Sequence, residues 1–167
     1  VRHPRLPVAD AERVVQIRNW DRSAAQTEGR ALHDFIVWRE QVRTIEHLGA
    51  AIPFVRNLTT GDRRVEPVSG AEISANAFRL MGTAPVLGRT LTERDEVAGS
   101  PPVVVIGHAV WTSRFNGDPG VLGQAVKLGT VTATIVGVMP ERFGFATNQR
   151  LRTPLRLDGA APPSPTG

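Results

Sequence analysis

Apolar and polar positions follow two different periods along the chain, and the clearest change of period lies in its second half. Residues 103–106 form a run of valine and isoleucine that predicts a buried strand, and Gly107 ends it. Trp111 and Phe115 stand four residues apart, a spacing that puts both rings on one face of a helix. Over residues 124–136 apolar side chains recur at alternate positions, which predicts a β-hairpin.

The connections between these elements contain residues with defined turn geometry. Asn116 and Gly117 tolerate a positive φ, so they predict the end of the helix. Asp118 and Pro119 predict a second helical start, because aspartate is favoured at the N-cap and proline at the first helical position. Gly123 is expected to end that short turn. The whole segment is therefore predicted as strand, helix, turn and hairpin.

The first half of the chain predicts one long helix and two strands. Apolar residues recur at intervals of three and four over residues 31–48, and we expect this helix to pack on a sheet. The apolar positions are Phe35, Trp38, Val42, Ile45 and Leu48. Residues 50–60 and 64–73 predict strands, and Ser74 is a suitable N-cap for a short helix after them.

The predicted fold class is α+β, with mixed β-α-β units and a second lobe of short helices and a β-hairpin. We expect residues 1–86 to form the first lobe and residues 87–148 to form the second. Residues 149–167 lead into a stretch rich in proline, alanine and glycine, and they are predicted to be a disordered tail. The first residue is not methionine, so the chain is expected to be a segment of a longer protein.

Composition and charge exclude several classes of protein. The net charge is +4, nearly all basic residues are arginine, and acids are interleaved with them, so no basic stripe suggests nucleic-acid binding. The absence of cysteine excludes a disulfide scaffold and a thiolate metal site. The apolar runs are far shorter than the roughly 20 residues that a membrane helix needs.

Few residues are arranged for catalysis or metal binding. No P-loop motif occurs, so the chain is not expected to bind ATP in that way. His108, with Ser113 or Asp118, offers a candidate arrangement for a small hydrolase. The acidic cluster at residues 93–96 lacks the alternating oxygen ligands of a calcium loop and is interpreted as a helix start. We predict no catalytic, cofactor-binding or metal-binding residue, and no cofactor.

A longer motif joins the signals of the second half. Its order is Trp-x-x-Arg-Phe-x-Gly-Asp-Pro-x-x-x-Gly, followed by the hairpin and then by Val-Gly-Val-Met-Pro at residues 136–140. This order resembles the MacB-like periplasmic core domain of ABC-transporter permeases, a class that includes FtsX-like and orphan permeases. Residues 34–41 and 68–82 resemble the same family, so the likeness covers roughly residues 8–145. The positions singled out as its structural motif are Trp38, Trp111, Arg114, Phe115, Gly117, Asp118, Pro119, Gly123, Gly137, Met139 and Pro140.

Two places depart from the family's usual pattern. Gly129 and Thr130 stand where Asn-Gly is common, and glycine at that position suits a type II′ turn, so the hairpin is expected to persist. Ala31 and His33 stand where a Ser-x-Pro helix start is common, which leaves the long helix less well capped.

The resemblance implies a non-catalytic extracytoplasmic domain on the periplasmic face of a bacterial membrane. Its implied role is mechanotransmission, which means that it transmits conformational change from a separate ATPase. Efflux is the implied kind of transport. The implied partners are the transmembrane helices of the permease, a second copy or duplicated half, the ABC ATPase indirectly, and a periplasmic adaptor. Exposed arginines such as Arg114 or Arg142 are candidates for contact with a partner chain. The alternatives are a small hydrolase around His108 and a basic nucleic-acid-binding module.

Overall fold

The computed structural model describes residues 20–21, 26–27, 31–42, 47–141, 143 and 150–156. A short separate pair is formed by β1 and β2, and the other strands belong to the main sheet. The elements in chain order are β1 (Trp20–Asp21), β2 (Gln26–Thr27), α1 (Ala31–Gln41), β3 (Ala51–Thr59), β4 (Val65–Ile73), α2 (Ala75–Met81), β5 (Leu87–Gly88), α3 (Glu93–Glu96), β6 (Val103–Gly107), α4 (His108–Phe115), the 3-10 helix η2 (Pro119–Val121), β7 (Ala125–Leu128), β8 (Val131–Met139) and β9 (Leu151–Pro154).

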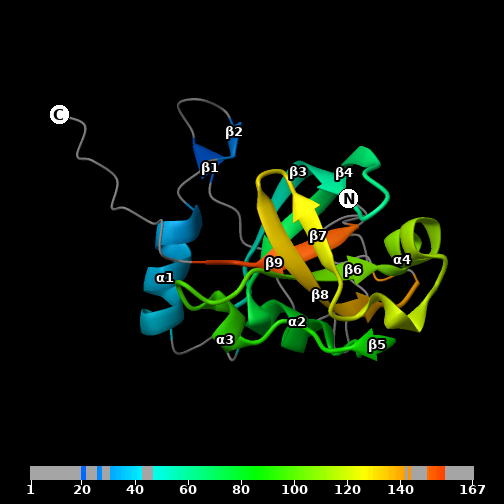
Figure 1. The fold of residues 1–167 in the computed structure, drawn as a ribbon. Helices are drawn as coiled ribbons and strands as arrows, with labels where there is room; N and C mark the ends of the chain where they lie inside the picture. The colour runs from blue at the N-terminus through cyan, green and yellow to red at the C-terminus, as the bar shows by residue number, and fades with distance from the viewer. Residues whose placement is uncertain are drawn as a thin grey trace, which may run out of the picture.

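The main sheet closes on itself. Its strands pair in the order β5-β8-β6-β9-β4-β3-β7, and β7 pairs with β8 as well, so the strands from β8 to β7 form a small barrel to which β5 is added (Figure 1). Two pairs are parallel, β4 with β9 and β6 with β8, and the others are antiparallel. This mixed sheet with its short helices confirms the predicted α+β class.

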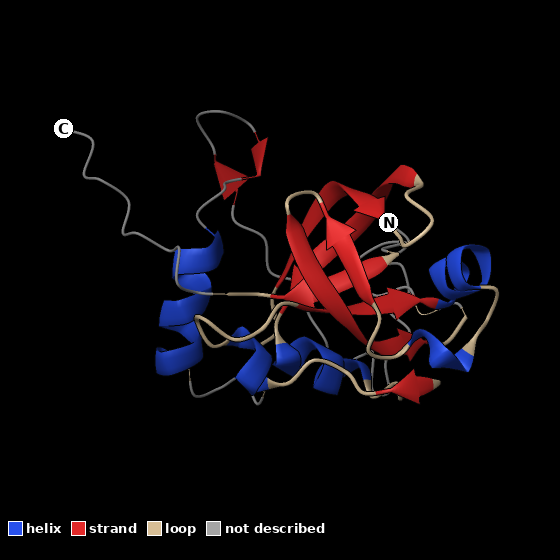
Figure 2. Ribbon diagram, in the orientation of Figure 1, coloured by secondary structure: helices blue, strands red, loops and turns tan. Residues whose placement is uncertain are grey.

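Apolar side chains fill the barrel and a second layer outside it. In β6, Val104 and Ile106 point into the barrel, whereas Val103 and Val105 point outward. The outward pair packs with Phe78 of α2, and Figure 2 shows α2 and α3 along one side of the strands with α4 at one end. Because both faces of β6 are buried, its sequence is a continuous apolar run rather than an alternating one.

The predicted hairpin is formed by β7 and β8, and an irregularity in β8 changes its alternation. Ala133 and Ile135 lie in the barrel interior as period two requires, but the next interior residue is Val138. The pairing of β6 with β8 shifts between Val104 and Val105, and this shift leaves one extra residue in β8. Such a bulge reverses the facing of the residues that follow, so Met139 packs outside the barrel.

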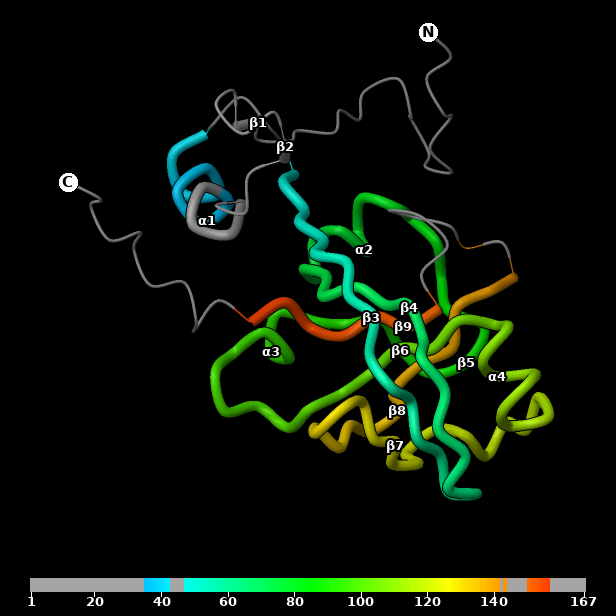
Figure 3. Tube along the Cα trace, turned by 90° about the horizontal axis from the view of Figure 1, so that it is seen from above, coloured from blue at the N-terminus to red at the C-terminus, as the bar shows by residue number. Residues whose placement is uncertain are grey.

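The long helix predicted over residues 31–48 is wrong in its length and its packing. The structure ends α1 at Gln41, and the described residues that follow, 42 and 47–50, are not helical. The sequence after Gln41 contains β-branched residues, which are weaker helix formers. Figure 3 shows α1 beyond the start of β3 rather than over a face of the sheet.

The tail predicted from residue 149 is wrong at its beginning. Leu151–Pro154 forms β9, which lies in the middle of the sheet between β4 and β6. Leu151 and Leu155 are fully buried, and the backbone of β9 forms hydrogen bonds with both β4 and β6. This segment is therefore ordered, although a proline stands at the end of the strand. Residues 157–167 lie outside the described residues. Strands from all three predicted ranges share one sheet, so the two expected lobes are not separate sheets.

Candidate functional site

The motif residues from Trp111 to Gly123 close one end of the barrel. Trp111 and Phe115 pack from one face of α4 against the barrel core. The indole Nε1 of Trp111 donates a hydrogen bond to the backbone oxygen of Asp118 at 2.8 Å, which fastens the helix to the turn that follows it. This contact makes α4 and η2 one folded unit.

Each turn residue in this unit has the geometry that the sequence predicted. Asn116 and Gly117 adopt positive φ values of 53° and 67° at the end of α4. The carboxylate of Asp118 accepts a hydrogen bond from the amide of Gly120 at 2.8 Å, and Pro119 is the first residue of η2. Gly123 has a φ of 84°. These conformations confirm the predicted helix stop and restart.

Arg114 is the motif residue whose position the sequence did not predict. Its side chain is 2% exposed, so its expected contact with a partner chain is wrong. The guanidinium donates to the hydroxyl of Thr60 at 2.6 Å and to the backbone oxygen of Arg64 at 2.8 Å. It also pairs with Glu66 at 3.3 Å and Asp62 at 3.6 Å. Arg142, the other candidate, lies outside the described residues.

The partners of Arg114 form a connected network at the tip of the β3–β4 hairpin. The hydroxyl of Thr60, the amide of Arg64 and the charge of Arg114 lower the pKa of Asp62 below its usual value. Glu66 is also 3.6 Å from Arg150, which directly precedes β9. Three segments distant in sequence are therefore joined: the β3–β4 tip, α4 and the start of β9.

The remaining motif residues lie in three different places. Gly137 is in β8 where the backbone of Arg89 crosses it, and a Cβ added there would lie 2.0 Å from the Arg89 oxygen. Met139 is fully buried in the layer beneath α2, and the backbone oxygen of Pro140 accepts a bond from Phe143. Trp38 is on α1, away from the others. Their functional role stays a prediction.

The side chains proposed for a hydrolase are not arranged for catalysis. Although His108, Ser113 and Asp118 lie in one segment, no hydrogen bond in the described structure joins the histidine to either partner. The Ser113 hydroxyl donates to the backbone oxygen of Ala109 at 2.6 Å, and Asp118 accepts from a backbone amide. The His108 ring instead stands edge-on to Trp111 at 5.6 Å.

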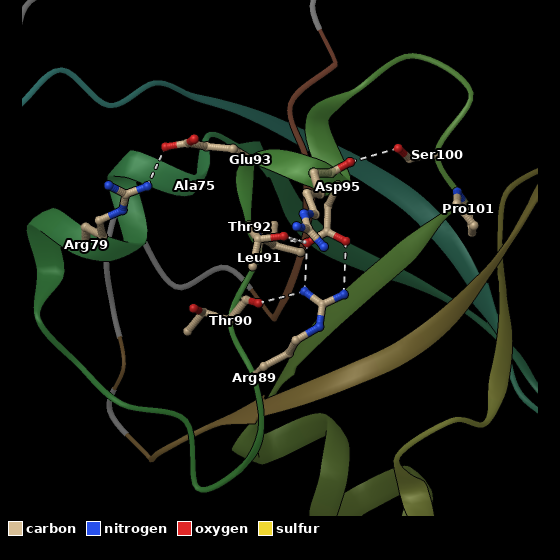
Figure 4. Close-up of a pocket in the computed structure, with 11 residues that line it drawn as sticks. Ala75, Arg79, Arg89, Thr90, Leu91, Thr92, Glu93, Asp95, Ser100 and Pro101 are labelled. Atoms are coloured by element: carbon tan, nitrogen blue, oxygen red, sulfur yellow. Dashed lines mark hydrogen bonds and ion pairs between the residues drawn. The ribbon is translucent and has the colours of Figure 1, made fainter.

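The structure also contains a hollow, lined by both polar and apolar groups, that sequence reasoning missed. Its volume is about 810 Å³, and it is bordered by α2, by the loop between β5 and α3, by α3, and by the loop before β6. Figure 4 shows Arg79 paired with Glu93 on one side of it, and Arg89 paired with Asp95. The capping pattern of Thr92 and Asp95 was visible in the sequence, but the crossing of these segments was not.

Asp95 is the structural centre of this hollow. One carboxylate oxygen accepts from Arg89 Nη1 at 2.7 Å, from the Thr92 amide at 2.7 Å and from the Thr92 hydroxyl at 2.9 Å, and the other accepts from Arg89 Nη2 at 3.0 Å. Burial favours the neutral acid, but the bonds from Arg89 and Thr92 outweigh it, so the pKa of Asp95 is lowered. The acidic cluster at residues 93–96 is therefore a capped helix start, as predicted.

Asp95→Asn is expected to lower the free energy of unfolding by about 1–2 kcal/mol at neutral pH, since it removes a cap and an ion pair. The Asp95 pKa is lower in the folded chain than in the unfolded one. Its stabilisation is therefore complete above the unfolded pKa of about 3.9 and is lost as the pH falls through the folded pKa. Urea unfolding at neutral and acidic pH measures the difference, which should shrink in acid. A difference that stays constant down to acid would contradict this role.

A buried guanidinium lies on the outer face of β9. Arg152 is 1% exposed, its Nη2 donates to the backbone oxygen of Phe143 at 3.0 Å, and its guanidinium lies 4.5 Å from the Phe143 ring centre. No carboxylate in the described residues pairs with it, and burial lowers the pKa of Arg152 to about 10. The Phe143 ring stacks in turn on Phe78 of α2, so Arg152 connects the sheet to that helix.

The described part of the chain has neither a helix that could span a membrane nor a cluster of metal ligands. No helix there is long and apolar enough to cross a membrane. No group of three or more histidine, aspartate or glutamate side chains in that part is placed to hold a metal ion. The arginines whose ion pairs are described are scattered over several elements, so they do not form one basic face.

Comparison with known proteins gives one family and several related folds. A family model described as MacB-like periplasmic core domain matches residues 5–161. The periplasmic region of MacB from Actinobacillus actinomycetemcomitans is similar at a TM-score of 0.60 and 19% identity, over 84% of this chain and 57% of that one. The extracellular domain of the noncanonic ABC-type transporter YknZ from Gram-positive bacteria is similar at 0.60 and 17%, over 73% and 61%.

A domain of a permease protein from Porphyromonas gingivalis is similar at a TM-score of 0.52 and 15% identity, over 72% of this chain and 50% of that one. No curated protein matches the chain. At these identities the solved structures show a shared fold. The chain spans less than two thirds of the length of each of them.

Proposed function

The chain belongs to the family of MacB-like periplasmic core domains, and from this premise we propose that it is the non-catalytic extracytoplasmic module of an ABC-transporter permease. In this proposal a separate ATPase hydrolyses ATP, and the module moves as one stiff body in response. Its partners are the transmembrane helices of the permease, a second copy or duplicated half, and a periplasmic adaptor. It works on the periplasmic face of a bacterial membrane.

The observation that supports this proposal best is the way in which distant segments are fastened together. The sheet closes on itself, so a displacement of one strand is passed around the ring. The buried guanidinium of Arg114 fastens the α4–η2 unit at the barrel end to the β3–β4 tip. A body that transmits motion must deform little under load, and close packing with a buried polar network meets this need.

The proposal is tested by distances within and between domains in the full-length permease with its ATPase. A pair of spin labels can be placed on cysteines substituted for two exposed residues of the module, which itself has no cysteine: Asn116 after α4 and Thr130 in the turn between β7 and β8. ATP binding is expected to change the distance between Thr130 labels on the two copies and to leave the Asn116–Thr130 distance within one copy unchanged. If the distance within one copy changes as much as the distance between copies, the module is not a stiff transmitter.

A further inference from the structure

The hollow between α2 and α3 is large enough to hold a ligand. Its volume of about 810 Å³ is within the range of sites that hold ligands larger than a single ion. In Figure 4 the pair of Arg79 and Glu93 borders one side, and Ser100 and Pro101 border the other. A ligand that fills it must therefore extend across several residues of the wall.

The walls of the hollow are held in place by hydrogen bonds from all sides. Asp95 receives four hydrogen bonds at the centre. Glu96 accepts from the amide of Ala75 at the start of α2, and the Ser100 hydroxyl donates to the backbone oxygen of Arg94 at 2.7 Å. A site that is already ordered loses little conformational entropy when a ligand binds.

The side chains of the hollow offer more donors than acceptors. Arg79, Arg89 and Arg94 line it, against the carboxylates of Glu93 and Asp95. Asp95 is saturated by its hydrogen bonds, whereas the pair of Arg79 and Glu93 is more than half exposed, so it is weak. The exposed guanidinium of Arg94 makes no hydrogen bond or ion pair with any described residue. Within the described part of the chain, its donors are therefore available to a ligand.

From this arrangement we infer that the hollow binds an acidic peptide segment of a partner protein. Carboxylates match the planar donors of Arg94, and a second carboxylate replaces Glu93 as the partner of Arg79. The exposed ring of Pro101 supplies an apolar contact for the peptide between the two acids. Binding of an acidic segment at this hollow does not depend on whether the module transmits motion.

The test is a calorimetric titration of the full-length permease, at low salt, with a short capped peptide of alternating glutamate and alanine. Arg94→Gln is expected to weaken binding about tenfold, since it removes a charged donor pair. Glu93→Gln is expected to strengthen binding about threefold, because it frees Arg79 from its competing carboxylate. Both variants should melt at the parent temperature, since neither side chain fixes the fold.

The matched control is Arg64→Gln, which removes the same charge from an exposed arginine at the β3–β4 tip and should change the affinity less than twofold. An equal loss in the two arginine variants would mean general charge attraction and would overturn the site. Equal binding of a glutamine–alanine peptide, or no binding of the acidic one, would do the same. Binding to vesicles of anionic phospholipid that depends on Arg94, without binding of the acidic peptide, would replace the peptide by a lipid headgroup.

Discussion

Replacing Gly137 by alanine is expected to lower the free energy of unfolding by about 3 kcal/mol, near the upper end for an overpacked position. The added Cβ would lie 2.0 Å from the backbone oxygen of Arg89 and 3.0 Å from its carbonyl carbon. Because these atoms belong to the backbone, a change of rotamer cannot relieve the clash. The segment that contains β5 must leave β8, and its bonds between Arg89 and Val136 and between Val86 and Val138 are lost.

Thermal unfolding measures the size of this effect, and amide exchange locates it. A loss of about 3 kcal/mol corresponds to a fall in Tm of roughly 6–12 °C for a chain of this length. Hydrogen exchange at the Arg89 amide should also be faster in this variant than in the parent protein. The control is Gly61→Ala, because a Cβ at that turn meets no atom within 4 Å. Equal melting temperatures of the two variants would show that the pairing of β5 with β8 does not require the absence of a side chain at Gly137.

Local signals predicted the segment from Asn116 to Gly123 well, because its geometry is decided by neighbouring residues. Positive φ values occur where asparagine and glycine stand, and an aspartate caps the turn that proline starts. Gly137 belonged to the predicted motif too, but the reason for a glycine there is the backbone of Arg89, 48 residues away in the chain and brought near by β5. A sequence alone shows the glycine and not the crossing strand.

Contacts between distant segments account for what the sequence did not predict. The central position of β9 depends on hydrogen bonds to β4 and β6, and Leu151 alone was too short an apolar signal to reveal a strand. The barrel is closed by the pairing of β3 with β7, which involves only two residues of each strand. So short a pairing produces no recognisable pattern in the amino-acid sequence of either strand. The hollow around Asp95 is hidden for the same reason, since its walls come from separate parts of the chain.

The burial of Arg114 had a signal in the sequence that its charge obscured. Arg114 follows Trp111 by three residues, and this spacing places it beside the apolar face of α4 rather than opposite to it. Arginine is rarely buried unless it is paired, and its partner carboxylates, Asp62 in the β3–β4 turn and Glu66 just after it, lie about 50 residues earlier. Local reasoning therefore placed the residue at the surface, although the face it occupies points inward.

Arg114→Met is expected to lower the free energy of unfolding by about 2–3 kcal/mol, because it leaves charged partners without their cation. This loss of stability is smaller than that for a fully buried ion pair, because the Asp62 side chain is 59% exposed and Glu66 retains Arg150 at 3.6 Å. The hydroxyl of Thr60 and the backbone oxygen of Arg64 also lose a donor. Urea unfolding of the variant gives the total loss.

A second substitution separates the charge effect from the loss of packing. Adding Glu66→Gln to Arg114→Met removes the carboxylate that lay nearest to the lost guanidinium, so the double variant should recover about 1 kcal/mol of the loss. Arg79→Met is the comparison for an exposed pair and should cost less than about 0.5 kcal/mol. If the two arginine variants unfold alike and Glu66→Gln restores nothing, the network at the β3–β4 tip does not hold α4 in place. The stiffness on which the proposed transmission rests would then have to come from the closed sheet alone.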